Sequence, residues 1–235
     1  RSDEDLGHNG RIMATALSTW NGPRSEVLVA AKGGMTRPDG RWDRNGRPDH
    51  LRRACDRSLK ALGVDRIDLY QFHAPDPQVP FAESVGMLAE LQGVGKIRWV
   101  GLSNVSVDQI NAARRHVEVV TVQNRLNPWF REALEQGVVE HCERLGIGFL
   151  AYSPVGGGRL NKKLPAHPVV KAIAERHGAS PHAVVLAWVL EQASNVIVIP
   201  GARTVEHALD SMTAGALRLE AEELRDLDEA HFDRT

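Results

Sequence analysis

The stretch Ile67-Asp68-Leu69-Tyr70-Gln71-Phe72-His73 decides the fold. Its mostly apolar part ends on an ionisable imidazole, and the turn residues Ala74-Pro75-Asp76-Pro77 follow at once. A short apolar run closed by turn residues is typical of a β-strand that is buried on both faces of a parallel sheet. Functional residues of barrels and doubly wound sheets lie where such strands pass into loops. His73 occupies that position.

Five other stretches have the same form and alternate with helical patterns. The predicted strands are Val27–Lys32, Ile67–His73, Ile97–Ser103, Val119–Asn124, Gly148–Ser153 and Val196–Ile199. Predicted helices cover residues 3–20, 49–62, 81–94, 107–115, 131–145, 168–177 and 181–192, and two more begin near Thr204 and Ala221. Strands that alternate with helices of this length imply parallel pairing with right-handed crossovers. We expect one α/β domain over residues 1–235.

Composition excludes several classes of partner. The 235 residues carry 29 basic and 30 acidic side chains, a net charge of -1, which predicts neither a nucleic-acid nor a membrane-surface site. Cys55 and Cys142 lie far apart in helical patterns, so we expect structural thiols in a reducing, cytoplasmic protein. No apolar run reaches the roughly 18 residues of a membrane span. The histidines lack ligand spacing with carboxylates or cysteines, and no metal site is expected.

The predicted strands share a further property, because each brings polar groups or glycine to its carboxyl end. These residues are Lys32, His73, Ser103, Asn104, Gln123, Asn124, Tyr152, Ser153, Gly201, Ala202 and Arg203. A single polar residue at a strand end usually makes only local hydrogen bonds. Six strand ends of this kind predict one site along the edge, and a barrel would gather all six around one mouth.

These strand ends resemble the aldo-keto reductase superfamily. The matching stretches are VLVAAKG (27–33), LKALGVDRIDLYQFH (59–73), GKIRWVGLSN (95–104), VQNRLNP (122–128), GIGFLAYSP (146–154) and IPGAR (199–203). The resemblance implies a (β/α)8 TIM-type barrel that binds a nicotinamide dinucleotide without a Rossmann motif. It also implies reduction of an aldehyde or ketone, a small carbonyl substrate, to an alcohol.

The resemblance assigns the catalytic roles to Lys32 and His73. Lys32 matches the lysine whose charge lowers the pKa of a proton-donating tyrosine, and His73 matches the histidine that orients the substrate carbonyl. Such roles suit the chemistry, because hydride transfer builds negative charge on the carbonyl oxygen and a phenol of pKa ~10 is a poor acid without a neighbouring cation.

The same resemblance implies a cofactor site. Its residues are Ser103, Asn104, Gln123, Tyr152, Ser153, Pro154, Gly201, Ala202, Arg203, His207, Asp210 and Ser211. The first three would bind the nicotinamide carboxamide, and Tyr152 would stack on the ring. The next two would follow the pyrophosphate, and the rest would hold the adenosine end, where helix N–H groups suit phosphate.

Two departures from the family pattern matter. The family's aspartate and proton-donating tyrosine precede the helix that opens this chain, so the first two βα units are missing and we expect an upstream segment. Tyr70 cannot replace that tyrosine, because strand alternation points it away from the face of His73. At the 2′-phosphate end, His207, Asp210 and Ser211 stand where the family often has arginine and a Glu-Asn pair. We expect NADPH, held in part by Arg203, with NADH as the alternative.

The sequence thus supports a reductase as the first hypothesis. The alternative is a non-catalytic, nicotinamide-dinucleotide-binding regulatory subunit, as in the family's ion-channel β-subunits. A third reading is a fragment with neither property. Trp42, Trp129 and Phe130 are candidate walls of an apolar substrate pocket, with loop aromatics that pack on their own barrel as the alternative.

Overall fold

The computed structural model describes residues 7–234, which fall into two compact units, one ending at Val122 and the other beginning at Gln123. Both units combine helices with parallel strands, so the predicted α/β class is confirmed. No helix among the described residues is long and apolar enough to cross a bilayer. Within the same residues, no three His, Cys, Asp or Glu side chains are grouped as metal ligands.

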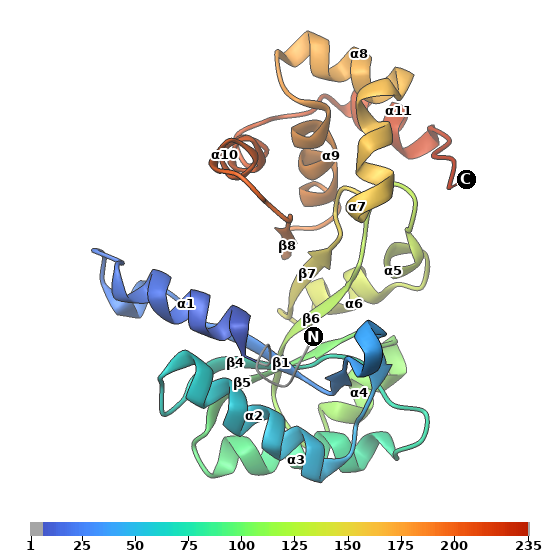
Figure 1. Cartoon of the computed structure of the whole chain (residues 1–235). Helices are drawn as coiled ribbons and strands as arrows, with labels where there is room; N and C mark the ends of the chain where they lie inside the picture. Colours follow the sequence, from blue (N-terminus) through green and yellow to red (C-terminus); the bar gives the residue numbers. More distant parts are fainter. Residues whose placement is uncertain (1–6, 235) are drawn as a thin grey trace. The chain divides into compact units, whose positions relative to one another are not determined.

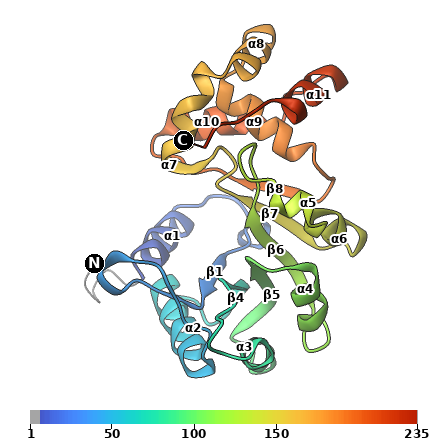
Figure 2. The ribbon, with the colours of Figure 1, turned by 90° about the vertical axis from the view of Figure 1, so that its right-hand side faces the viewer.

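The first unit is built on the parallel strands β1 (Ala30–Gly33), β4 (Ile67–Phe72) and β5 (Ile97–Ser103), with β4 in the middle. The register aligns Tyr70 with Val100 and Phe72 with Leu102, and all four side chains are completely buried. Helices α2 (Pro48–Leu62) and α3 (Phe81–Gly93) cover this face (Figure 2). The rings of Phe72 and Phe81 lie 6.2 Å apart. The opposite face therefore carries the polar side chains.

Helix α2 shows why these segments become helical. Pro48 stands at its first position, where a missing N–H costs nothing, and Gly63 ends it in the left-handed conformation at φ 67°. Asp49 in the first turn and Lys60 in the last complement the helix dipole. The unit also contains α1 (His8–Ser18) and α4 (Val107–Ala113). A capping box formed by Ser106 and Gln109 starts α4.

The second unit surrounds one apolar helix. α9 (Pro181–Leu190) is buried from Ala183 to Val189, and its Trp188 indole donates to the Asp228 carboxylate at 2.9 Å. Around it lie α8 (Pro168–His177), α10 (Val205–Thr213) and α11 (Ala221–Glu229) (Figure 1). The parallel strands β7 (Gly148–Tyr152) and β8 (Val196–Ile199) complete the unit. β6 (Val119–Arg125) carries the chain from the first unit to the second.

Three sequence predictions are corrected. β1 begins at Ala30 rather than Val27, because the Val29 N–H donates to the Asp68 carboxylate at 2.9 Å and leaves the strand pattern. The helix predicted over 131–145 is two helices, α5 (Glu132–Glu135) and α6 (Val138–Arg144), separated at Gly137 by its positive φ of 68°. The first helix is shorter than predicted at its carboxyl end, and residues 3–6 of that prediction lie outside the described residues.

Two segments that lie between the predicted strands and helices also contain regular structure. Residues 36–48 hold most of a small hairpin, in which β2 (Met35–Thr36) pairs antiparallel with β3 (Asp43–Arg44) around the 3-10 turn η3 (Pro38–Gly40). Residues 156–168 hold the short helix α7 (Gly157–Leu160) and the 3-10 helix η4 (Asn161–Ala166). The sequence did not predict these elements, because each is too short to show the hydrophobic periodicity of a strand or a helix.

Candidate active site

The polar face of the first unit begins with Lys32 on β1. Lys32 pairs with Gln71 on β4, and Gln71 pairs with Gly101 on β5, so the three residues share one face. Gln71 is 1% exposed and donates to the Thr121 hydroxyl at 3.3 Å. A Cβ at Gly101 would collide with both of these side chains. Sequence reasoning missed Gln71, although a polar residue within an apolar run and two residues before His73 was a usable signal.

His73 follows the last residue of β4 and is fixed through its backbone. Its N–H donates to the Gly33 carbonyl at 2.8 Å, and its own carbonyl accepts from the Asn104 amide at 3.0 Å. Burial lowers the pKa of its imidazole to about 4, and the nearby positive charge of Lys32 acts in the same direction. His73 is therefore neutral at physiological pH, and one ring nitrogen can donate a hydrogen bond without carrying charge.

Lys32 itself is held close enough to His73 for its charge to act on the imidazole. Partial burial of its ammonium lowers the pKa of Lys32. A lysine pKa can fall substantially in such surroundings while the group still carries its charge at neutral pH. The pair thus combines a cation and a neutral hydrogen-bond donor beside the carboxyl ends of β1 and β4.

The carboxyl end of β5 supplies Ser103 and Asn104. Ser103 is 1% exposed, and its hydroxyl accepts from the Asn104 amide at 3.2 Å. Asn104 has a φ of 56°, in the left-handed region that asparagine tolerates better than most residues. That conformation lets one amide group bridge Ser103 and the His73 carbonyl. The structure therefore brings together the four predicted site residues of this unit.

Tyr70 cannot act in this site. It is completely buried on the opposite face of β4, and its hydroxyl abuts the backbone of Gly33, where a Cβ would collide with it. Burial raises the pKa of this phenol, which makes it a weaker acid.

In the second unit, Tyr152 and Ser153 stand at the end of β7. Ser153 has a φ of 50°, and its carbonyl accepts from the Asn127 amide at 2.9 Å. Asn127 is completely buried, and its own amide oxygen accepts from the backbone N–H groups of Trp129 and Phe130. Asn127 therefore ties the chain after β6 to the chain after β7. Asn127 lies in the matching stretch VQNRLNP, but no local pattern predicts this bridging role.

The same edge carries the remaining nicotinamide candidates of this unit. Gln123 is 3% exposed in β6, and burial raises the pKa of the Tyr152 phenol. Pro154 follows Ser153, and Gly156 has a φ of 86° where a Cβ would collide with Trp129 and Leu160. The backbone of Gly156 therefore packs against these two side chains at the start of α7.

The residues predicted for the adenosine end lie around the start of α10. Gly201, Ala202 and Arg203 are exposed between β8 and the helix. Thr204 caps α10 by accepting from the His207 N–H at 3.2 Å. Asp210 accepts from the Ser180 hydroxyl at 2.7 Å, and the Ser211 hydroxyl donates to the His207 carbonyl at 2.8 Å. Asp210 and Ser211 thus already serve contacts within the unit.

Comparison with known proteins identifies the family. The sequence profile of the Aldo/keto reductase family matches residues 6–231. The chain belongs to the aldo/keto reductase family.

A probable aldo-keto reductase of Glycine max is 34% identical over 88% of this chain and 68% of its own length. A thermostable aldo-keto reductase, solved with the inhibitor epalrestat, superposes with a TM-score of 0.82, 30% identity, and coverage of 94% of this chain and 77% of its own. An aldo/keto reductase from Klebsiella pneumoniae, solved with NADP and acetate, superposes with a TM-score of 0.79 and is 27% identical. The match covers 94% of this chain and 75% of that structure. The chain spans about two thirds, 66 and 68%, of the curated relatives it matches.

Proposed function

We propose that the protein reduces an aldehyde or ketone to an alcohol with NADPH. The observation that carries the proposal is the pair formed by Lys32 and His73 at the carboxyl ends of two neighbouring strands, with the pKa of the His73 imidazole lowered to about 4 by burial and then by Lys32. A neutral donor beside a cation suits a carbonyl oxygen on which negative charge develops. Family membership and the NADP-bound relative from Klebsiella pneumoniae support the choice of chemistry.

Each unit offers side chains of a kind that suits a nicotinamide cofactor. Buried Ser103 and Gln123, together with Asn104, offer hydroxyl and amide groups of the kind that bind a carboxamide, and Tyr152 offers an aromatic ring. When bound, the cofactor supplies the hydride. In the proposal, His73 donates a hydrogen bond to the substrate oxygen and orients the carbonyl. Lys32 favours the anionic form of a proton-donating tyrosine, the partner that the family resemblance implies for this lysine.

The preference for NADPH rests on the exposed end of the site. Arg203 lies between β8 and α10, and a guanidinium can bind a 2′-phosphate with two parallel hydrogen bonds. His207 lies in the first turn of α10, where the backbone N–H groups favour an anion. NADH lacks this phosphate and would gain nothing from either residue.

The test is turnover by the purified protein. NADPH oxidation is followed at its absorbance maximum with a small aldehyde, for the wild type, Lys32→Met and His73→Ala. We expect cofactor affinity to stay within about threefold and kcat/KM to fall by about 100-fold or more in each variant. Cofactor binding without turnover in the wild type would instead favour the regulatory-subunit hypothesis. Absence of both would contradict the proposal.

A further inference from the structure

The hairpin β2–β3 carries a tryptophan that the proposed chemistry does not use. Trp42 directly precedes β3 and keeps 61% of its surface exposed. Its indole nevertheless has defined neighbours, because the ring centroid lies 5.6 Å from that of His73, with the ring planes at 64°. An exposed indole beside the residue that would orient the substrate is placed to contact the rest of that substrate.

One face of this indole is already covered. The Arg37 guanidinium carbon lies 4.1 Å from the ring centroid, a cation–π contact, and the same guanidinium donates to the Gly40 carbonyl at 2.9 Å. Arg37 thus joins the turn of the hairpin to the indole. Arg37 covers one face of the ring, and the 61% exposure of Trp42 leaves indole surface that a ligand can contact.

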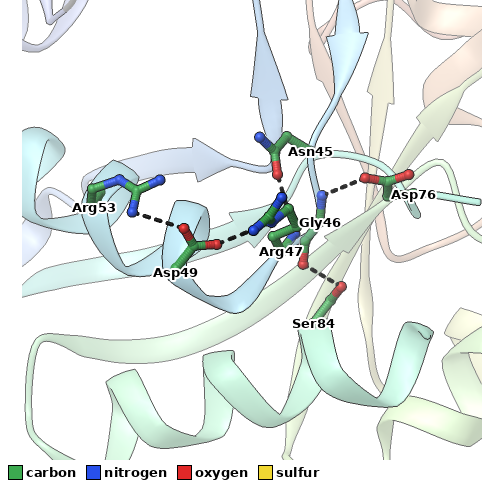
Figure 3. Close-up of polar contacts among 7 residues, drawn as sticks. All are labelled: Asn45, Gly46, Arg47, Asp49, Arg53, Asp76 and Ser84. Carbon is green, nitrogen blue, oxygen red and sulfur yellow. Dashed lines mark hydrogen bonds and ion pairs between the residues drawn. The ribbon is translucent and has the colours of Figure 1, made fainter. Parts of the chain in front are cut away.

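The base of the hairpin is clamped to the chain that follows His73. The Gly46 N–H donates to the Asp76 carboxylate at 2.9 Å, and the Gly46 carbonyl accepts from the Ser84 hydroxyl at 2.7 Å (Figure 3). Asp76 is three residues after His73, and Ser84 is buried in α3. The Asn45 N–H also donates to the Gly34 carbonyl at 3.0 Å. The hairpin and the His73 loop are therefore parts of one fixed surface.

The clamp admits only glycine at its centre. A Cβ at Gly46 would lie 2.8 Å from the Ser84 hydroxyl oxygen and 2.9 Å from Cβ of Asp76. Arg47, the residue after Gly46, pairs with Asp49 in the first turn of α2, and Asp49 also pairs with Arg53 one turn later (Figure 3). Trp42 therefore lies on a hairpin whose base is fixed by the contacts of Gly46, and its own ring contacts Arg37 and His73.

We infer that Trp42 determines specificity by stacking on flat, conjugated carbonyl substrates, aryl aldehydes and ketones, beside His73. The inference rests on the proposed function and deepens it by naming the substrate class. A planar ring conjugated to the carbonyl stays coplanar with the group that His73 orients, so it meets the open indole face when the oxygen is bound. An alkyl aldehyde of similar size offers no aromatic face for offset stacking.

The test compares benzaldehyde with butanal in the full-length enzyme. For Trp42→Ala we expect kcat/KM for benzaldehyde to fall about tenfold, with less than a twofold change for butanal. Trp42→Phe keeps most of the preference because it retains an aromatic face. Trp20→Ala is the matched control, since Trp20 is a 50% exposed tryptophan at the end of α1. Equal loss for both substrates, or an unchanged ratio, overturns the inference.

A second measurement separates this inference from the proposed function. Benzamide, an unreactive planar carbonyl compound, is titrated into 15N-labelled protein, and the indole N–H signals are assigned with the Trp42→Phe and Trp20→Phe variants. We expect a saturable shift of the Trp42 signal and none of the Trp20 signal. If neither aldehyde is reduced while this shift persists, the proposed function fails and the aryl site stands. If Trp42 does not respond, the aryl site is disproved whatever the turnover.

Discussion

The imidazole of His73 is neutral above a pH of about 4, because burial and then the charge of Lys32 both disfavour its protonated form. The folded pKa lies below the ordinary value of 6.5, so the unfolded chain binds the extra proton first. The stability that this group contributes is complete above pH ~6.5 and is lost as the pH falls toward 4.

An NMR titration tests that assignment directly. We expect the His73 ring signals to show no titration step between pH 5 and 8. Lys32→Met should raise the pKa of His73, because the substitution removes one of the two causes that lower it. A midpoint near 6.5 in the wild type would show that the imidazole is solvated and ordinary.

Arg203 is the residue on which cofactor choice depends in the proposal. Arg203→Ala should weaken NADPH binding by about tenfold, the equivalent of one charge-assisted contact, and leave NADH binding nearly unchanged. Dissociation constants for both cofactors are measured by fluorescence titration. Asp226→Ala, which removes an exposed charge on α11, serves as the control for unspecific charge effects. Equal weakening of both cofactors would place Arg203 elsewhere than at a 2′-phosphate.

At the scale of elements, the hairpin clamp predicts an asymmetry between two glycines. Gly46→Ala forces a Cβ against Ser84 and Asp76 and should destabilise the fold by about 1–3 kcal/mol. Gly86→Ala, in the exposed middle of α3 with open space around its Cα, should stabilise it by about 0.5–1 kcal/mol. Urea unfolding of both variants gives the comparison, and similar shifts would show that the clamp yields easily.

The elements also show where sequence reasoning succeeds. β5 and β8 have the predicted bounds, since short, mostly apolar runs that end at polar or turn residues favour a strand. The helix over 131–145 was predicted too long because its apolar spacing continues through Gly137, and only the backbone reveals the positive φ. The hairpin at 35–44 was missed because each of its strands has two residues.

For the molecule as a whole, the candidate site was predictable where it depends on strand ends and unpredictable where distant residues pair. Lys32, His73 and Asn104 follow from their positions along the chain. The bridge from Asn127 to Ser153 and the clamp from Gly46 to Asp76 and Ser84 join positions that are 26, 30 and 38 residues apart. No local pattern encodes such a pairing, because the partners come together only after the strands and helices pack.

The two cysteines offer a test of the single domain predicted over residues 1–235, because Cys55 lies in the first compact unit and Cys142 in the second. Burial raises the pKa of the Cys55 thiol to about 11 and that of Cys142 to about 12, so neither forms much thiolate at pH 8. We therefore expect both to resist iodoacetamide in the folded protein.

Each thiol then reports the opening of its own unit as urea is added. β6 begins in one unit and ends in the other. Unfolding of either unit therefore leaves β6 incomplete. That continuity predicts one cooperative transition, with coincident midpoints for Cys55 and Cys142 when labelling is quantified by peptide mass spectrometry. Midpoints separated by more than about 0.5 M urea, about 1 kcal/mol for a unit of this size, would show two domains that unfold independently.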